Sequence, residues 1–177
     1  MDRLLSVGLL AAIALPLMAG LSHAQRSSDD PGAAAAPIVA GYLERMTLTK
    51  HRLTFEAKLD SGADTSSLNA EGIEQTRKSG RAMARFTLVD DTGRRAVVEA
   101  PVVRTARIRR AGTGPVERPV VVLDVCIAGV SGKAEFTLTD RSGMSAQVLI
   151  GRRFMARRIL IDPSRRHLGS GRCGRPN

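Results

Sequence analysis

The sequence LTFEAKLDSGADTSSL, residues 53–68, joins an alternating segment to a short polar turn and decides the fold. Apolar and polar residues alternate through its first half, which is typical of a half-buried strand. Asp60 stands at the end of that strand and is followed by Ser61, Gly62 and the small Ala63. Gly62 allows a tight turn that brings backbone N–H groups close to the Asp60 carboxylate. Asp-Ser-Gly is also a common structural turn, so these residues alone leave a catalytic and a structural interpretation open.

The catalytic interpretation needs two copies of this loop. Ser61 can hydrogen-bond across to a neighbouring copy, and two facing loops would hold two Asp60 carboxylates about 3 Å apart. Two like charges that close cannot both ionise, so the pair shares one proton. The ionised carboxylate takes a proton from water, and the protonated one polarises the scissile carbonyl. Because each chain supplies one Asp60, we expect the active form to be a symmetric homodimer.

A second acidic tripeptide, Asp91-Thr92-Gly93, is predicted to be a hairpin turn. It follows Asp60 too closely for two complete catalytic lobes within one chain. Two arginines come directly after it, where a buried active-site loop would need small apolar residues. The tripeptide lies between predicted strands at 85–89 and 95–99, as expected for a β-hairpin.

The rest of the chain is predicted to consist mainly of short strands. The only helical pattern covers residues 151–158, and a turn is expected at 111–115. Many short strands separated by turn signals predict a compact all-β sandwich or barrel. The further predicted strands cover residues 102–108, 119–127, 134–139, 147–150 and 159–163.

Composition limits the function classes open to the chain. Of its 177 residues 43% are hydrophobic, enough to build a core, and only 3% are aromatic, with no tryptophan. We therefore expect a core of Val, Leu, Ile and Ala. The net charge is +10, but aromatic platforms for stacked bases are scarce and no nucleic-acid-reading motif is present. We expect no nucleic-acid partner.

The N-terminus has the layout of a secretory signal peptide. Residues 4–21 carry no charge, and Ser22-His23-Ala24 places small residues before a cleavage point. An uncleaved membrane anchor is the alternative. We expect a signal peptide at 1–24, a small and polar linker at 25–37 and a folded domain at 38–177. The mature chain would be periplasmic or secreted and free of the membrane.

The two cysteines, Cys126 and Cys173, lie in an apolar run and near the C-terminus. An oxidising compartment permits a disulfide between them, which would attach the basic tail to the domain. The alternative is a buried free thiol at Cys126 and a loose thiol at Cys173.

A second motif lies far downstream, where Leu149-Ile150-Gly151 forms an apolar-apolar-Gly step before the short helix. Asp60-Ser61-Gly62-Ala63 together with this motif resembles the two sequence halves of a retropepsin, the dimeric aspartic protease fold. One bacterial retropepsin-like family, long labelled ATP-dependent zinc protease, is similar over about residues 40–168. The segments that carry this resemblance, in order and spacing, are KLDSGADTSSLNAEGIE, VEAPVV, RPVVVLDVCIAG and LTDRSGMSAQVLIGRRFMARRILIDPS.

The resemblance implies an all-β fold, a closed retropepsin-like barrel with one short helix. It implies that Asp60 is the catalytic aspartate and that Ser61-Gly62-Ala63 completes the active-site loop. Leu149-Ile150-Gly151 would pack beneath this loop and support it. The stretch 107–118 would form a flap-like hairpin over the substrate.

The chain departs from the family pattern at three positions. Ser61 stands where Thr is usual, which is a mild change because the hydroxyl remains. Asp64 stands where the family often has Arg, and Asn69 where it often has His. These two differences bear on substrate preference rather than on the chemistry.

The zinc and the ATP of the family's label do not fit the residues. A catalytic zinc needs three protein ligands, and the mature chain has only His51 and His167, with no H-E-x-x-H motif. The segment Gly129-Val130-Ser131-Gly132-Lys133 lacks the earlier glycine of a phosphate loop, and Ala134 follows its lysine. We expect no metal and no cofactor.

Arginine makes up most of the basic excess, and it clusters on the predicted flap, near the short helix and toward the end of the chain. Such clusters would steer an acidic substrate into a cleft, although a solvated basic surface is the other interpretation. Some relatives are associated with peptide-ligating enzymes of the ATP-grasp type, and this resemblance implies glutamate-rich or otherwise amide-ligated substrates. The clusters are Arg104, Arg107, Arg109 and Arg110; Arg152, Arg153, Arg157 and Arg158; and Arg165 and Arg166.

The sequence therefore predicts an exported aspartic endopeptidase. It would hydrolyse peptide or amide bonds of a peptide or protein substrate, with a water activated by an Asp60 pair across a homodimer. Two other interpretations stay open. One is a non-catalytic exported binding module of the same fold that docks acidic or cell-envelope polymers through its basic face. The other is a structural or regulatory periplasmic protein in which Asp-Ser-Gly is only a turn.

Overall fold

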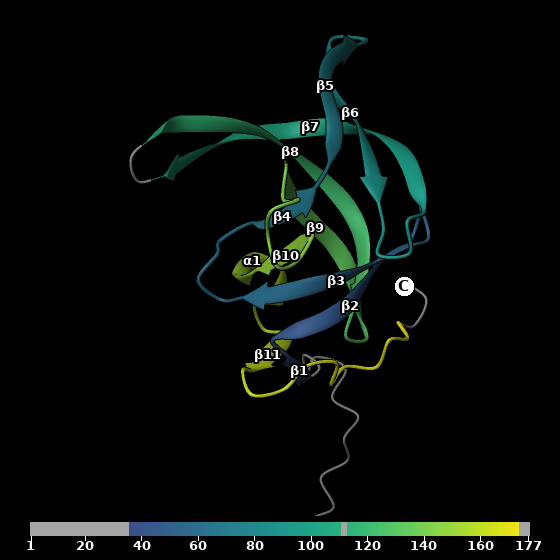
Figure 1. Ribbon diagram of the computed structural model, residues 1–177, viewed down its shortest axis with the longest axis vertical. Coiled ribbons are helices and arrows are strands. Elements are labelled where there is room, and N and C mark those ends of the chain that lie inside the picture. Colours follow the sequence, from purple (N-terminus) through teal and green to yellow (C-terminus); the bar gives the residue numbers. More distant parts are fainter. Residues whose placement is uncertain (1–35, 111–112, 174–177) are drawn as a thin grey trace, which may run out of the picture. The chain divides into compact units, whose positions relative to one another are not determined.

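A ring of paired strands organises the part of the chain that the structure, a computed structural model, describes: residues 36–110 and 113–173 (Figure 1). The predicted signal peptide at 1–24 and most of the predicted linker at 25–37 lie outside these ranges. Within them, we find no helix with the length and apolar character that crossing a bilayer requires.

In the described ranges the only helix is α1 (Arg152–Met155), which precedes the last strand. The strands are β1 (Ile38–Gly41), β2 (Leu43–Leu48), β3 (Leu53–Asp60), β4 (Ser66–Asn69), β5 (Glu71–Lys78), β6 (Arg81–Val89), β7 (Arg95–Arg110), β8 (Thr113–Ile127), β9 (Val130–Thr139), β10 (Val148–Gly151) and β11 (Ile159–Asp162).

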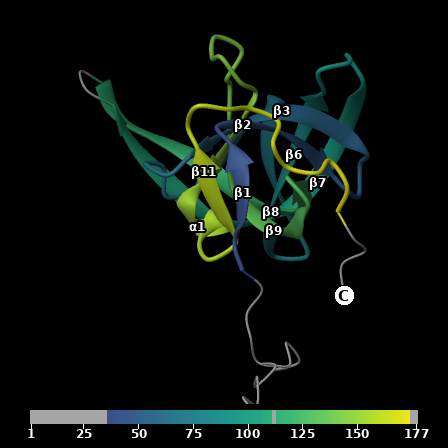
Figure 2. The same ribbon diagram turned by 90° about the horizontal axis from the view of Figure 1, so that it is seen from below.

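The ring closes because β8 pairs with β2 as well as with its neighbours β9 and β7. The sheet has nine strands in the order β2-β3-β10-β4-β9-β8-β7-β6-β5, and the additional pairing sets Thr47 on β2 opposite Cys126 on β8. Strands β7, β6 and β5 continue the sheet beyond the ring (Figure 1). The predicted all-β closed barrel with one short helix is confirmed. β1 and β11 form a separate parallel pair (Figure 2).

Alternating strand residues supply the apolar core. Along β3 every second residue is buried, from Leu53 to Leu59, as the alternation in the sequence predicts. All four phenylalanines of the chain are buried, at 3% exposure or less, and burying each side chain stabilises the fold by about 2–3 kcal/mol. The expected core of Val, Leu, Ile and Ala was therefore incomplete, because the few aromatic residues fill its largest sites.

Strands β7 and β8 are longer than the predicted strands that they contain. The predicted strands at 95–99 and 102–108 form one strand, β7, which includes Pro101. The register of β7 with β8 shifts just after this proline, between Val102 and Arg104. Proline is tolerated in a strand beside such an irregularity. The predicted turn at 111–115 was too long, because β8 already begins at Thr113.

Strands β1, β2, β4 and β5 were not predicted. β4 has the polar sequence SSLN, and its pairing with β10 on one side and β9 on the other is a contact that no local pattern reveals. β5 is exposed along almost its whole length, so it lacks the alternation of a half-buried strand. The predicted helix at 151–158 was too long, because Gly151 belongs to β10 and the helix ends at Met155.

A disulfide and hydrogen bonds attach the segment after β11 to the barrel. Cys173 forms a disulfide with Cys126 on β8, with the two Cα atoms 5.8 Å apart, which decides between the two alternatives for the cysteines. The Glu44 side chain is buried, and its Oε1 accepts hydrogen bonds from the backbone N–H groups of Leu168 (2.8 Å) and Gly169 (3.0 Å). These bonds satisfy a carboxylate that would otherwise be costly to bury.

Removing the disulfide should destabilise the fold without changing it. We expect the double variant Cys126→Ser/Cys173→Ser to lose about 2–4 kcal/mol of unfolding free energy, because the bond restricts the unfolded chain across a separation of 47 residues. Urea denaturation followed by circular dichroism measures the change. The wild-type protein in reductant should unfold at the midpoint of the double variant. An unchanged midpoint in both would contradict the pairing.

Candidate active site

Asp60 is the last residue of β3 and lies beside β10, which is inserted between β3 and β4. β10 runs parallel to β3, and their register sets Gly151 opposite Asp60 and Ile150 opposite Leu59. On its other side β10 pairs antiparallel with β4. The two motifs that were predicted to form one site, although distant in the sequence, therefore lie next to each other in the sheet.

The loop after β3 folds back on the Asp60 carboxylate. The Gly62 N–H donates to Asp60 Oδ1 (2.9 Å), and the Ala63 N–H donates to the Asp60 carbonyl oxygen (3.3 Å). Asp60 is half-buried, whereas Ser61 and Gly62 are exposed. The loop is therefore held in a tight turn while its tip faces solvent.

Gly151 allows the polypeptide after Asp60 to pass close to β10. A Cβ atom at this position would lie 2.7 Å from the Thr65 carbonyl carbon and 2.8 Å from the Asp64 carbonyl oxygen. The Gly151 N–H donates to the buried Ser66 Oγ (3.1 Å). Only a residue without a side chain fits this approach, which gives the apolar-apolar-Gly step a physical role beneath the loop.

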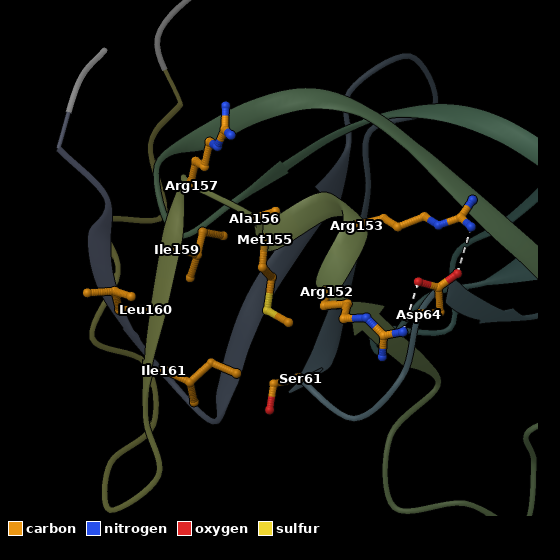
Figure 3. A pocket seen from close by; sticks show the side chains of 10 residues that line it. All are labelled: Ser61, Asp64, Arg152, Arg153, Met155, Ala156, Arg157, Ile159, Leu160 and Ile161. Atoms are coloured by element: carbon orange, nitrogen blue, oxygen red, sulfur yellow. Dashed lines mark ion pairs between the residues drawn. The ribbon is translucent and has the colours of Figure 1, made fainter. Parts of the chain in front are cut away.

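Ion pairs support the loop on the side of α1 (Figure 3). The Asp64 carboxylate lies 3.2 Å from Arg152 and 2.8 Å from Arg153, and Arg152 Nη1 donates to the Gly62 carbonyl oxygen (3.2 Å). These side chains are about half exposed, so each pair contributes no more than about 1 kcal/mol to stability. Asp64, where the related family often has arginine, thus pairs here with two arginines.

A second set of contacts joins the loop to β7 and β9. Arg104 on β7 donates to Glu135 Oε2 through Nε (3.0 Å) and Nη2 (2.6 Å), and Nη2 also donates to Thr65 Oγ1 (3.0 Å). On the far side Arg153 lies 3.8 Å from the Glu135 carboxylate. Sequence reasoning missed this connection, and its only signal was the place of Arg104 in an arginine cluster.

A hollow of about 510 Å³, the cleft, lies between the loop and the hairpin of β7 and β8. The loop contributes residues 63–65, the hairpin contributes 104–108 and Arg118, and Leu149 lies among the remaining lining residues. β7 and β8 pair along the predicted flap-like segment 107–118 (Figure 1). The cleft therefore has the loop that follows Asp60 on one side and a hairpin on the other.

A second hollow of about 640 Å³, the groove, lies next to the loop between α1 and β11 (Figure 3). Met155 and Ile161 point into it, and Ser61 lies at its edge. On the adjoining pair of strands, Val39 of β1 stands opposite Leu160 of β11, and these side chains are 53% and 56% exposed. An apolar surface thus adjoins the loop that carries Asp60.

The other acidic tripeptide lies in the turn between β6 and β7, as predicted. Just before it, Asp90 is buried, and its Oδ1 accepts hydrogen bonds from the Thr92 hydroxyl (2.6 Å) and from the N–H groups of Thr92 and Arg94 (both 3.0 Å). Burial opposes ionisation of Asp90, but these hydrogen bonds lower its pKa on balance. Asp90 therefore stabilises the turn, whereas the Asp91 carboxylate accepts a hydrogen bond from the Glu56 N–H on β3.

The residues present do not fit the zinc or the ATP of the related family's label. Among residues 36–110 and 113–173, no group of three or more His, Cys, Asp or Glu side chains could hold a metal ion. His167 Nε2 lies 3.0 Å from Glu56 Oε1. The glycine-containing segment 129–133 leads from a turn into strand β9 instead of a helix, and Lys133 Nζ pairs with Asp124 (2.8 Å).

Comparisons with known proteins match this architecture. A family model described as the retropepsin-like aspartic endopeptidase RimB, of the RimB-like family, matches residues 39–170. The chain belongs to this family. The resemblance inferred from the motifs is thereby confirmed. The crystal structure of a Legionella pneumophila protein of unknown function is similar with a TM-score of 0.64 and 30% sequence identity, over 73% of this chain and 96% of that one.

Curated relatives carry a different name. Probable alpha-L-glutamate ligases from Shewanella pealeana and Parasynechococcus marenigrum are 31% and 34% identical over 112 and 116 residues. The matches cover 62% and 63% of this chain but 24% and 25% of the ligases. The similarity thus spans about a quarter of the length of these relatives.

Adding a methyl group at Gly151 should displace the loop. We expect Gly151→Ala to lower the free energy of unfolding by about 1–3 kcal/mol, because the new Cβ would overlap the Thr65 and Asp64 backbone. Urea denaturation measures this cost, and amide hydrogen exchange of residues 61–66 reports the loop. Gly143→Ala is the matched control, since a Cβ there meets nothing within 4 Å. Equal stability of the two variants would contradict the packing argument.

Proposed function

We propose that this chain is an aspartic endopeptidase whose active form is a homodimer with one Asp60 from each subunit. The observation that carries the proposal is the position of Asp60 at the end of β3, held in its turn by the Gly62 N–H, packed beside Gly151 and followed by a loop that borders the cleft. Membership of a family of retropepsin-like aspartic endopeptidases supports the same assignment.

The proposed reaction needs one proton shared by two Asp60 carboxyl groups. The ionised Asp60 removes a proton from a water molecule, whose oxygen attacks the scissile carbonyl carbon. Asp60 of the partner subunit, protonated, donates a hydrogen bond and then its proton to the carbonyl oxygen. When the tetrahedral intermediate collapses, the C–N bond breaks, the leaving nitrogen takes the proton that came from water, and the hydroxyl proton returns to the pair. Neither a metal nor a cofactor is needed.

An apolar surface beside the loop supports a second copy of the chain as the partner. Val39 and Leu160 are more than half exposed on neighbouring strands, and the groove extends this surface to Ser61. Exposed apolar surface of this kind marks interaction sites. A two-fold contact here would use the same surface on both subunits and would bring the two loops together.

Arginines in the cleft support an acidic substrate. Arg118 lines the cleft together with Arg104 and Arg107, which also pair with Glu135 and Glu117. The net charge of +10 adds long-range attraction. The curated relatives are named for glutamate ligation, which suggests glutamate chemistry in those proteins. We propose peptides rich in acidic residues, including glutamate, as substrates. Ligation is not part of the proposal, because the similarity spans only about a quarter of the ligases.

We also propose that the chain is exported to the periplasm or secreted, on the basis of the predicted signal peptide at 1–24. The disulfide between Cys126 and Cys173 supports an oxidising compartment.

Replacing Asp60 should abolish hydrolysis and leave the fold intact. Residues 25–177, as wild type and as Asp60→Asn, would be incubated with a peptide pool that includes glutamate-rich members, from pH 4 to pH 8 with a chelator. We expect the variant to lose at least about a thousandfold in rate, because the amide cannot act as a base. Mass spectrometry of the products measures cleavage.

The controls separate this activity from a contaminant. Excess Asp60→Asn subunits mixed with wild type should inhibit cleavage, since mixed dimers hold only one carboxylate. Equal cleavage by both proteins would assign the activity elsewhere. The proposed function would be wrong if the wild type, in dimeric form, cleaved no member of the pool.

Charging the apolar surface should separate the subunits. We expect Leu160→Lys to shift the protein from dimer to monomer in sedimentation velocity and to reduce cleavage in parallel, because a lysine ammonium cannot be buried unpaired in an apolar contact. Val97→Lys is the matched control, since Val97 is likewise an exposed aliphatic residue, at 59%, but lies on β7. A dimer that survives Leu160→Lys would place the interface elsewhere.

A further inference from the structure

Arg104 connects three parts of the molecule that meet at the cleft. It stands on β7, in the strand that continues into the flap-like hairpin. Its guanidinium bonds to Glu135 on β9 and to the Thr65 hydroxyl in the loop after Asp60. The Arg104 and Glu135 side chains are each only 35% exposed, which makes this the least exposed of the Arg–carboxylate pairs described around the loop.

The local structure of β7 aims this side chain at the loop. The register between β7 and β8 shifts between Val102 and Arg104, so the intervening Val103 has no paired position, and it is 51% exposed. An irregularity of this kind bends a strand and redirects a side chain. In this chain the Val103 side chain is exposed, and the Arg104 side chain lies within hydrogen-bond distance of Glu135 and Thr65.

The contacts of Arg104 continue into the ion pairs on the other side of the loop. Glu135 lies 3.8 Å from Arg153, and Arg153 lies 2.8 Å from Asp64, which also pairs with Arg152. The loop is thus held at Thr65 from the hairpin side and at Asp64 from the helix side. The hairpin and α1 are therefore joined through contacts of the residues that follow Asp60.

The chemistry at this position requires arginine. A guanidinium can bond Glu135 through two nitrogens and still donate to Thr65. A lysine ammonium is a point charge on a flexible chain and cannot reproduce this planar geometry. It would keep attraction to Glu135 but lose the simultaneous bond to Thr65.

We propose that Arg104 is a positioning residue that couples the flap-like hairpin to the active-site loop through its bond to Thr65. Its role does not require contact with the reacting atoms. The position of the loop then fixes the position of the hairpin over the cleft, and the position of the hairpin in turn orders the loop. The consequence for catalysis rests on the proposed function, but the coupling itself does not.

The first experiment measures the coupling without any substrate. Amide hydrogen exchange of the full mature chain would be compared for wild type, Arg104→Lys, Thr65→Val and Arg95→Lys. We expect exchange in residues 61–66 to rise about tenfold or more in the first two variants, because the local opening that exposes these amides becomes easier. Arg95→Lys is the matched control, since Arg95 is on the same strand and pairs with Glu71 (2.6 Å) away from the loop.

The second experiment tests whether one bond explains both variants. The double variant Arg104→Lys/Thr65→Val should exchange no faster than the more affected single variant, because both changes remove the same hydrogen bond. The single variant Thr65→Ser keeps the hydroxyl that Thr65→Val removes, so its residues 61–66 should exchange as slowly as those of the wild type. Strictly additive effects, or a failure of Thr65→Ser to restore slow exchange, would overturn the proposal. So would exchange in Arg104→Lys no faster than in Arg95→Lys.

The third experiment examines catalysis with a peptide that wild type cleaves in an Asp60-dependent manner. Arg104→Lys and Thr65→Val should each lower kcat by about tenfold while KM changes less than about threefold, because a misplaced loop impairs the reaction more than binding. A change confined to KM would make Arg104 a binding residue and overturn its positioning role. If wild type shows no Asp60-dependent cleavage, the proposed function fails, and the exchange results alone decide the coupling.

Discussion

The insertion of β10 between β3 and β4 is the constraint on which the candidate site depends. It sets Gly151 opposite Asp60, and the chain that leaves β3 must then pass within van der Waals distance of the Gly151 backbone. The Gly151 N–H donates to Ser66, the first residue of β4. Strand β10 therefore contacts both ends of the loop, at Asp60 and at Ser66. Sheet pairing therefore sets the two ends of the loop, and the contacts of residues 62–65 hold the turn between them.

The charges around this loop have two different effects. Those next to α1 are about half exposed and screened, so they contribute little energy individually. Their arrangement still matters, because Asp64 offsets part of the positive charge of Arg152 and Arg153 beside Asp60. In the cleft, by contrast, Arg104, Arg107 and Arg118 face the space that a substrate would fill. Two of these three are also paired with carboxylates, Arg104 with Glu135 and Arg107 with Glu117.

The parts of the fold that could be predicted are those whose signal is local. Alternation gave β3, the turn residues gave the hairpin at Asp91, and the two short motifs identified the family together with the loop and its supporting strand. β4 and β5 could not be found, because one is polar and buried only by its neighbours, and the other is exposed on both faces. The Arg104–Thr65 contact depends on a register shift within β7 that becomes visible only when β8 is paired with it. The disulfide depended on the path of the tail, which the buried Glu44 helps to fix.

Because the loop is exposed in one chain, the proposed dimer would do more than supply a second carboxylate. Ser61 and Gly62 face solvent in one chain, and a carboxyl pair can share a proton only when the two groups are close together. A second copy seated on Val39, Leu160 and the groove would supply the second carboxyl and exclude water from the same place. Burial of the apolar surface and assembly of the catalytic pair would then be one event. The active site would exist only at concentrations where the dimer forms, and ligands that bind across the two subunits would stabilise it by mass action.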